Sequence, residues 1–513
     1  MDLFESALNG LQVAASPENL LYCLIGALVG MLVGVLPGLG PVATIAILLP
    51  ITYNMDPVAA IIMLSGIFYG AQYGGTITSV LLNLPGEATT VVTTFDGYQM
   101  ARQGRAGEAL GIAAIGSFIG GTVSVLGMTV LAPMLASVAI DFGPPEYAAL
   151  TLLGILLLST IGTGSTTKAL VGAAIGLLLA TVGRDPFTGV TRFTFGVGDL
   201  ADGLGFVPIA MGLFGLGEIL HGLDERAAPG ATTPRVGRAW PAMSDWTRSR
   251  AAVARGTVVG FLLGVLPGGG ATLASMLSYS LEKRVSKHRE EFGHGAIEGV
   301  AGPETANNAA ATSSFIPLLT LGIPANGTMA VILGALLLQG VQVGPTLVDE
   351  HPDIFWGVIS SMWVGNIFLL LLSVPLVGLF VRMLRVPGTL LAAVTVVVTM
   401  LGVYTIRNNI FDVYAAIFFG CLGYLMKKVG FDAAPLVLAF VLGSLLETSV
   451  RQSLRIFDGS LVGFVQRPIS GGILLLIVLL AASSPLLELF RRKVAQSTRE
   501  ASEAGEVDEV AHR

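Results

Sequence analysis

The sequence predicts an all-α polytopic membrane protein built from two inverted structural repeats, with Gly/Pro-broken re-entrant hairpins and about 11–13 membrane segments. Three observations support this fold class. The 513 residues are 53% hydrophobic and only 12% charged, whereas soluble domains carry roughly 25% charge. The missing charges leave uncharged runs of membrane length. A Pro-Gly motif also occurs twice, at corresponding places in the two halves of the chain.

The uncharged runs define the membrane segments. Lys, Arg, Asp and Glu are absent from residues 21–55, 109–140, 147–167, 256–281, 305–348 and 354–381. A helix needs about 20 apolar residues to cross the lipid bilayer, so several crossings are expected, and neither a soluble domain nor a single anchor fits. The net charge of −6 lies in short loops without a basic block, which excludes nucleic-acid binding.

An internal repeat divides the chain. Residues 34–40 read GVLPGLG and residues 264–270 read GVLPGGG, each in the first apolar segment of its half. Residues 84–89 (LPGEAT) are echoed more loosely by residues 323–328 (IPANGT). This duplication predicts two related membrane units. The expected order is an N-terminal membrane repeat (1–222), a cytoplasmic linker (223–255), a C-terminal membrane repeat (256–450), an extra C-terminal transmembrane helix (451–490) and a cytoplasmic tail (491–513).

Loop charges predict opposite orientations for the two repeats. Placing the basic loops in the cytoplasm gives each half five crossings and one hairpin, an odd number of passes. The hairpins would lie at residues 20–50 and 256–281, each bending at its glycines. A straight helix of about 30 residues would measure about 45 Å, longer than the ~30 Å bilayer core. A single tilted and kinked helix is the alternative. Inverted repeats with broken helices are typical of secondary transporters.

Four Gly/Pro breaks inside the apolar segments mark the expected binding site, at residues 37–41, 83–90, 267–270 and 324–328. Broken helices expose N–H groups that attract carboxylates and carbonyls that attract Na⁺. The pattern therefore favours an anionic substrate coupled to a cation. The alternative interpretation is that these residues only allow helices to pack closely.

Polar residues within the apolar runs complete the candidate site, because unpaired polar groups are costly in a membrane. The expected substrate-binding residues are Pro37, Gly38, Gly40, Thr78, Ser79, Asn83, Pro267, Gly268, Gly269, Gly270, Asn307, Asn308, Thr312, Ser313 and Asn326. The expected cation-binding residues are Glu87, Glu304, Asn307 and Asn308. Which residues hold the substrate and which hold the cation is left open. Glu87 and Glu304 could each also be a proton carrier or a loop residue near the membrane interface. No cofactor or metal is expected beyond a coupling ion, Na⁺ or H⁺.

Several ordered motifs resemble the large membrane subunit of the tripartite tricarboxylate transporters, the TctA family. They are GVLPGLGP at 34–41, YGAQYGGTITSVLLNLPGE at 69–87, FDGY at 95–98, EGVAGPETANNAA at 298–310 and LGIP at 321–324. The resemblance covers about residues 10–490. It implies a multi-pass protein of the bacterial inner membrane that imports a tricarboxylate or related carboxylate by symport with a cation. It also implies two partners: a small membrane subunit with about four helices and a periplasmic solute-binding protein.

Three other functions stay open from the residues alone. A carboxylate channel would share the same membrane composition. An intramembrane hydrolase is suggested by Gly196-Val197-Gly198-Asp199, which matches a Gly-x-Gly-Asp protease motif, but such an enzyme needs two carboxylates that share a proton. Asp199 lies in a polar loop, and no Tyr-Asp pair precedes it within an apolar segment. The third alternative is a structural or assembly subunit. The expected function is transport, without enzymatic activity.

Overall fold

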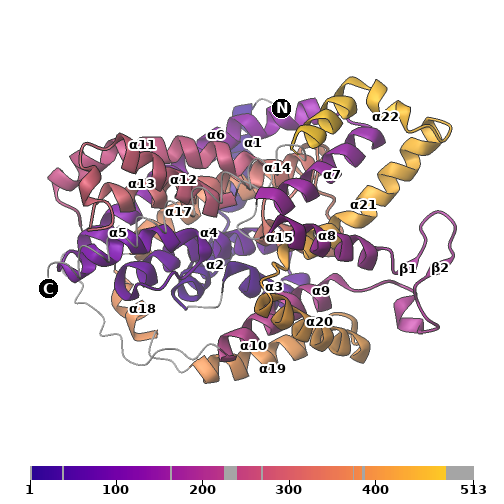
Figure 1. Cartoon of the computed structure of the whole chain (residues 1–513), viewed down its shortest axis with the longest axis horizontal. Coiled ribbons are helices and arrows are strands. Elements are labelled where there is room, and N and C mark those ends of the chain that lie inside the picture. The colour runs from indigo at the N-terminus through magenta and orange to yellow at the C-terminus, as the bar shows by residue number, and fades with distance from the viewer. Residues whose placement is uncertain are drawn as a thin grey trace, which may run out of the picture. The chain divides into compact units, whose positions relative to one another are not determined.

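The computed structural model describes residues 3–36, 40–161, 165–224, 240–266, 270–373, 375–383 and 388–480. These residues form a predominantly helical chain with one antiparallel strand pair (Figure 1). The predicted tips of the two hairpins, at residues 37–40 and 267–270, lie outside the described residues except for Gly40 and Gly270. Residues 225–239 of the predicted linker and the predicted C-terminal tail also lie outside them.

Helices account for most of the first half. Their bounds are α1 Leu3–Ala14, α2 Pro17–Val35, α3 Pro41–Tyr53, α4 Pro57–Leu82, η1 Ala88–Thr90, α5 Val91–Arg102, α6 Ala106–Ala139, α7 Pro144–Ile161, α8 Thr166–Ala180, η2 Gly198–Leu200, α9 Phe206–Ala210, the π-helical η3 Met211–Leu216 and α10 Gly217–Asp224. The two short strands are β1 Gly183–Arg184 and β2 Thr191–Arg192, with Gly183 opposite Arg192.

The described residues of the second half form helices joined by turns and loops, without a strand. Its bounds are α11 Met243–Val265, α12 Gly270–Val285, η4 Arg289–Glu291, α13 Glu298–Ser313, α14 Phe315–Leu321, α15 Gly327–Leu338, α16 Leu347–Glu350, α17 Pro352–Ser373, α18 Val377–Met383, α19 Gly388–Arg407, α20 Ile410–Lys428, α21 Ala434–Ile456 and α22 Val462–Gln466. A further apolar helix follows at Pro468–Leu480.

Length and hydropathy identify the helices that can cross a membrane. The described residues contain 7 helices of sufficient length and apolarity, together with shorter apolar helices of 10–17 residues. The 7 are Pro17–Val35, Pro57–Leu82, Ala106–Ala139, Phe206–Asp224, Pro352–Ser373, Ile410–Lys428 and Ala434–Ile456. The chain is therefore a helical polytopic membrane protein, as predicted. The inverted orientation of the repeats, the re-entrant hairpins and the division into repeats stay predictions.

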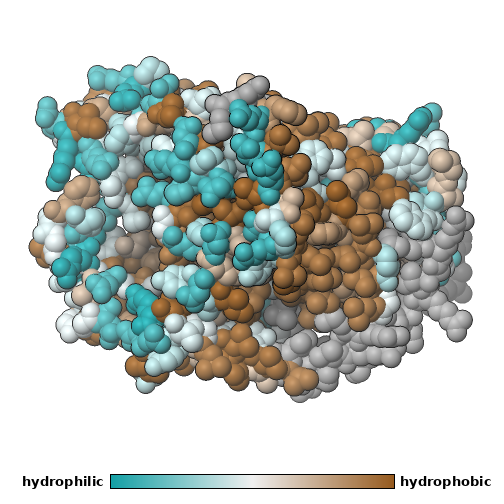
Figure 2. Space-filling model, turned by 180° about the vertical axis from the view of Figure 1, so that it is seen from behind, coloured by the Kyte–Doolittle hydropathy of each residue, from teal (hydrophilic) through white to brown (hydrophobic). Residues whose placement is uncertain are grey.

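Apolar side chains also cover part of the outer surface. Val123, Leu126, Val130 and Met134 are exposed along α6 at helical spacing. Figure 2 shows hydrophobic residues gathered over a broad area of one face. Because soluble monomers rarely expose large contiguous apolar areas, this surface suits contact with lipid.

Close glycine contacts join α2 to α4. A Cβ atom added at Gly26, Gly30 or Gly34 would lie only 2.2–2.4 Å from a carbonyl oxygen of α4. The oxygens belong, in the same order, to Met63, Ile67 and Ala71. Residue numbers rise together in the two helices, so α2 and α4 run parallel with their backbones in contact. Small residues permit this close approach in membrane helices.

The second half repeats this packing between α11 and α13. A Cβ atom added at Gly256, Gly260 or Gly264 would lie 2.2–2.4 Å from a carbonyl oxygen of α13. These oxygens belong to Gly302, Ala306 and Ala310, again in rising order. Gly34 and Gly264 open the two copies of the duplicated sequence motif. The sequence repeat thus corresponds to the same parallel helix pair, formed twice.

The duplicated glycines give a stability prediction. Gly264→Ala is expected to destabilise the protein by about 1–3 kcal/mol, the usual cost of overpacking, because the new Cβ would lie 2.0 Å from Ser313 Oγ and 2.4 Å from the Ala310 oxygen. Gly222→Ala is the control, because Gly222 has nothing within 4 Å of its added Cβ. Thermal unfolding of the purified variants measures the difference. Equal melting of both variants would show that the α11–α13 contact does not require glycine.

An ion pair shows that α11 and α12 fold back on each other. Arg255 donates two hydrogen bonds to Glu282, at 2.7 Å and 2.6 Å. Each residue lies about three turns from the break between the two helices, so α11 and α12 lie antiparallel and side by side. Glu282 is fully buried. These helices therefore form a helical hairpin, and whether it enters and leaves the membrane on one side stays a prediction.

Asp96 fastens the segment that precedes α13. Its fully buried carboxylate accepts hydrogen bonds from the backbone N–H groups of Gly293, Gly295 and Ala296, at 2.8–2.9 Å. The Tyr279 hydroxyl donates a further bond of 2.9 Å. Asp96 therefore ties α5 to α12 and to the start of α13.

Residues 142–156 and 445–480 belong to a second compact unit, and the rest of the described chain forms the first. Within the second unit, Arg467 Nε donates to the buried carboxylate of Glu146 at 2.8 Å. Ser470 Oγ donates to the Phe464 carbonyl at 2.6 Å. The candidate site lies wholly within the first unit.

Candidate functional site

A cavity of about 470 Å³ lies where three helices begin. Its wall contains the N-terminal residues of α3 (Gly40, Pro41 and Val42), α12 (Gly270, Ala271 and Thr272) and α15 (Asn326, Gly327 and Thr328). The first N–H groups of a helix have no partner within that helix, and each N-terminus carries roughly half a positive charge. The volume falls in the range of small-molecule sites, about 300–1,000 Å³. These helix ends therefore supply donors that can bind the oxygens of a small organic anion.

The Gly/Pro breaks place these helix ends at the cavity. Pro41 occupies the first turn of α3, where its missing N–H costs nothing. Gly270 begins α12 with a φ of 55°, a left-handed conformation that favours glycine. Asn326 caps α15, because its side-chain oxygen accepts from Met329 N at 3.0 Å. The structure thus brings together three of the four predicted breaks.

The fourth break, between α4 and α5, also lines the cavity through residues 85–89. Glu87 lies there immediately before η1, and its Oε1 is enclosed without a hydrogen-bond partner. Beside it, the Thr89 hydroxyl donates to Gln72 Oε1 at 2.8 Å, and both of these residues line the cavity. The Oε1 atom of Glu87 is therefore an acceptor without a hydrogen-bond partner at the cavity wall.

The remaining charges of the cavity come from α10, α20 and the turn that precedes α21. Lys427 forms an ion pair with Glu218, and Asp432 accepts a hydrogen bond of 2.9 Å from Ala434 N. The described lining residues thus include three carboxylates and one lysine. An anion entering this cavity meets helix N-termini and Lys427, but it needs added positive charge to offset the carboxylates.

Glu304 lies deeper, on α13, and does not line the cavity. Its carboxylate is 1% exposed and accepts hydrogen bonds from the hydroxyls of Thr76, at 2.7 Å, and Thr93. Glu304 is therefore a buried helical residue and not a loop residue. Asn308, on the same helix, donates to Ser117 Oγ at 2.7 Å. Asn307 is fully buried, and neither of its side-chain amide atoms has a hydrogen-bond partner.

Other predicted site residues do not line the cavity, and several of them form hydrogen bonds near the breaks or end a helix there. Thr78 Oγ1 donates to the Val35 carbonyl at 3.0 Å, and Ser79 Oγ donates to Thr90 Oγ1 at 2.9 Å. Asn83 ends α4 with a φ of 57°. Thr312 and Ser313 are buried in α13. Pro37, Gly38, Pro267, Gly268 and Gly269 lie outside the described residues. Ligand binding by any predicted site residue stays a prediction.

Sequence reasoning missed the polar groups that reach the site from distant segments. In the sequence, nothing distinguishes Lys427, Glu218 and Asp432 from other charged residues in loops or at helix ends. Thr76 and Gln72 lie within the 69–87 motif, and that motif could have indicated both residues.

Asp199, the candidate hydrolase residue, is exposed in η2 and accepts a hydrogen bond from Asn409 Nδ2 at 2.7 Å. An exposed carboxylate of this kind does not resemble a catalytic aspartate pair.

Comparison with known proteins identifies relatives. The family model described as "Tripartite tricarboxylate transporter TctA family" matches residues 20–438. An Agrobacterium vitis protein described as "Uncharacterized 52.8 kDa protein in TAR-I ttuC' 3'region" is 52% identical over 474 residues, covering 92% of this chain and 94% of the relative. A second A. vitis protein, "Uncharacterized protein in TAR-II ttuC' 3'region", is 56% identical over 215 residues, 42% of this chain and 89% of the relative. No solved structure matches.

Proposed function

The chain belongs to the tripartite tricarboxylate transporter TctA family, and from that premise we propose that it is the large membrane subunit of a binding-protein-dependent secondary transporter. It imports a tricarboxylate or a related carboxylate into a bacterial cell across the inner membrane. A Na⁺ or H⁺ gradient drives the uptake by symport. The family is a transporter family, which supports transport over hydrolysis.

The observation that carries this proposal is the convergence of the N-termini of α3, α12 and α15 on one cavity. Three N-termini present several free N–H groups, which bind carboxylate oxygens well. Lys427 adds a full positive charge to the same wall. A carboxylate with two or three charges matches several such donors at once.

The acidic residues of the cavity support coupling to a cation. Glu218 has Lys427 as its partner and Asp432 caps a backbone N–H, whereas Glu87 Oε1 has no hydrogen-bond partner. A cation bound at Glu87 would lower the repulsion that the substrate carboxylates meet. Substrate and cation would then enter the cavity together, as symport requires.

Two partners complete the proposed system. A small membrane subunit with about four helices would accompany this chain in the bilayer. A periplasmic solute-binding protein would capture the carboxylate and deliver it to the cavity. Uptake would then require all three proteins.

Reconstitution tests the proposal directly. The chain, its small partner and candidate binding proteins are placed in liposomes, and uptake of labelled citrate and other carboxylates is measured with and without Na⁺ or pH gradients. We expect saturable accumulation that needs both a gradient and a binding protein. Fluxes near diffusion without accumulation would indicate a channel, and absence of carboxylate movement in the intact complex would contradict the proposal.

Asn326 provides a test within the cavity. Asn326→Asp keeps an oxygen that can cap α15 but adds a negative charge where the substrate binds. We expect uptake to fall by about tenfold or more, equivalent to roughly 1.4 kcal/mol, while Asn326→Ser keeps both the cap and the uptake. Initial uptake rates at equal amounts of membrane protein measure the effect. Equal rates in the two variants would place the substrate elsewhere.

A further inference from the structure

Glu304 is a buried carboxylate without a positive partner among the described residues. Its two oxygens accept hydroxyl hydrogens from Thr76, on α4, and Thr93, on α5. Burying an ionised carboxylate costs several kcal/mol unless opposite charge offsets it. Two neutral hydroxyl donors supply hydrogen bonds but no charge. This residue therefore needs a compensating cation during at least part of its working cycle.

The titratable groups on the elements packed against α13 do not supply that charge. The acids and phenols among them are Tyr69 and Tyr73 on α4, Glu87 before η1, Asp96 and Tyr98 on α5, Glu108 on α6, Asp245 on α11, and Tyr279 and Glu282 on α12. Of the cations, Arg102, Arg250, Lys283 and Arg284 are exposed, and Arg248 pairs with Glu298 and Glu291. Arg255 is engaged by Glu282, and Tyr279 donates to Asp96. Tyr73 donates to Asn366 Oδ1 at 3.1 Å. Within the described ranges, Glu87, Asp96 and Glu304 have no ion-pair partner, and Asp96 is met instead by the Tyr279 hydroxyl and three backbone N–H groups.

Thr76 is placed to serve both protonation states of Glu304. Its Oγ1 lies 2.7 Å from Glu304 Oε2 and 3.2 Å from the Gln72 carbonyl oxygen. When Glu304 is ionised, the Thr76 hydroxyl donates to the carboxylate. When Oε2 carries a proton, that O–H donates to Thr76 Oγ1, and Thr76 turns its own hydrogen to the Gln72 carbonyl. Neither state leaves a buried donor without an acceptor.

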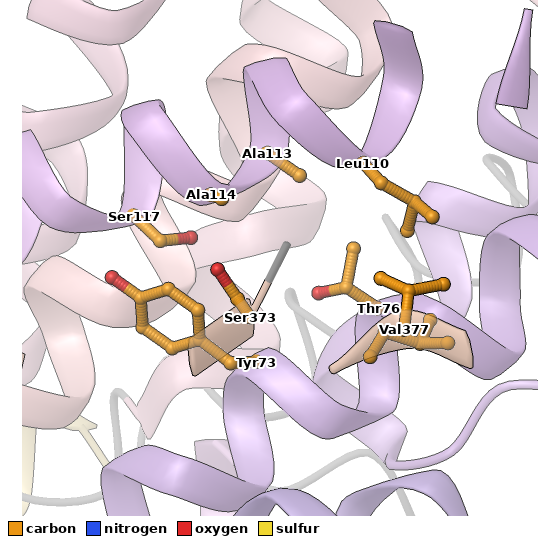
Figure 3. A pocket seen from close by; sticks show the side chains of 9 residues that line it. Tyr73, Thr76, Leu110, Ala113, Ala114, Ser117, Ser373 and Val377 are labelled. Carbon is orange, nitrogen blue, oxygen red and sulfur yellow. The ribbon is translucent and has the colours of Figure 1, made fainter. Parts of the chain in front are cut away.

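A small pocket beside Thr76 gives protons a place to approach; its wall is mostly apolar but includes four side-chain hydroxyls, from Tyr73, Thr76, Ser117 and Ser373. Its volume is about 20 Å³, enough for one water molecule. Figure 3 shows the hydroxyl groups of Thr76, Ser117 and Ser373 pointing toward one another in this pocket. A water needs two to four polar partners. These three oxygens can accept from a water, while their own hydrogens are donated to the Glu304 carboxylate, the Glu304 carbonyl and the Leu370 carbonyl.

We propose that Glu304 is a proton-binding site of the transport cycle, loaded through the pocket beside Thr76. A hydronium ion in the pocket gives its proton to Glu304 Oε2 and becomes water, which neutralises the buried charge, and the reverse transfer releases the proton along the same path. The link between this proton and carboxylate movement rests on the proposed function. The proton site itself does not.

The geometry favours a proton over Na⁺ at Glu304. Both carboxylate oxygens already accept hydroxyl hydrogens, and a metal ion would have to turn those hydrogens away and gather further oxygens. A proton needs only one oxygen and one acceptor, which Thr76 provides. A Na⁺ ion would instead bind at Glu87 or in the exposed part of the cavity at the helix N-termini.

Infrared spectroscopy of the purified, membrane-reconstituted protein tests the site without any substrate. We expect a carboxylic-acid C=O stretching band that titrates with pH in the wild type and in Glu87→Gln, and that is missing from Glu304→Gln. Thr76→Val should shift the band or its midpoint, whereas Thr76→Ser should restore the wild-type behaviour. A Glu304→Gln spectrum equal to that of the wild type would overturn the proposal, as would indistinguishable Thr76→Val and Thr76→Ser spectra.

Transport assays then test the link to uptake. Glu304→Gln is expected to lose accumulation driven by a pH gradient and to keep exchange of internal for external carboxylate. Accumulation at the wild-type level by this variant would overturn the role in coupling. If no carboxylate moves through wild-type protein, the proposed function fails, while the infrared result still decides the proton site.

Discussion

Replacing Lys427 with Gln is expected to lower carboxylate uptake by about ten- to a hundredfold. Lys427 is the one cationic side chain among the described residues that line the cavity. A hydrogen bond to a charged group contributes about 1.5–3 kcal/mol, and each 1.4 kcal/mol corresponds to roughly a tenfold change in affinity. The effect should appear as a raised KM in initial-rate measurements, because the lost contact is one of binding.

Two further variants separate substrate binding from the Lys427–Glu218 ion pair. Lys428→Gln is the matched control, since Lys428 contacts Asp224 and Tyr424 at exposed sites and does not line the cavity. It should transport normally. The double variant Lys427→Gln with Glu218→Gln removes both members of the pair and should stay impaired. Recovery of uptake in the double variant would mean that Lys427 only neutralises Glu218.

Asp96→Ala is expected to have the largest effect on stability. The variant leaves the N–H groups of Gly293, Gly295 and Ala296 without their acceptor in a buried place. An unsatisfied buried group costs about 1–3 kcal/mol, so the total loss should reach roughly 3 kcal/mol or more. Thermal unfolding of the purified protein measures it, and the yield of folded protein should fall as well.

Tyr279→Phe is the companion variant for Asp96. It removes one hydrogen bond to the same carboxylate and keeps the three backbone contacts. Its melting temperature should lie between those of the wild type and Asp96→Ala. If the melting temperature of Asp96→Ala equals that of the wild type, Asp96 does not stabilise the segment before α13.

The fold class and the breaks could be predicted from the sequence for a simple physical reason. Membrane helices need long apolar runs, and a Gly or Pro that interrupts such a run is visible without knowledge of tertiary contacts. The motifs around Gly40, Gly270 and Asn326 therefore marked three segments that line the cavity wall. The repeat was visible for the same reason, and it corresponds to the duplicated glycine contacts at Gly34 and Gly264.

The rest of the site depends on contacts between distant segments. Lys427 and Asp432 reach the cavity only because α20 and the start of α21 pack near α3 and α15, which no local pattern reveals. Thr93 likewise meets Glu304 only through the packing of α5 on α13. Polar residues such as Thr78 and Ser79 were expected in the site because they are rare in apolar runs, yet their hydroxyls secure neighbouring helix ends.

Thiol labelling tests the central claim most directly, namely that a carboxylate binds in the cavity at the helix N-termini. Thr272→Cys places a thiol at the start of α12 in the cavity wall, and Ser280→Cys places one on the exposed side of the same helix. The native Cys23 and Cys421 are first replaced with Ala. The account predicts that transported carboxylates slow labelling at residue 272 and leave residue 280 unchanged. Labelling at residue 272 that is the same with and without every carboxylate tested would contradict it.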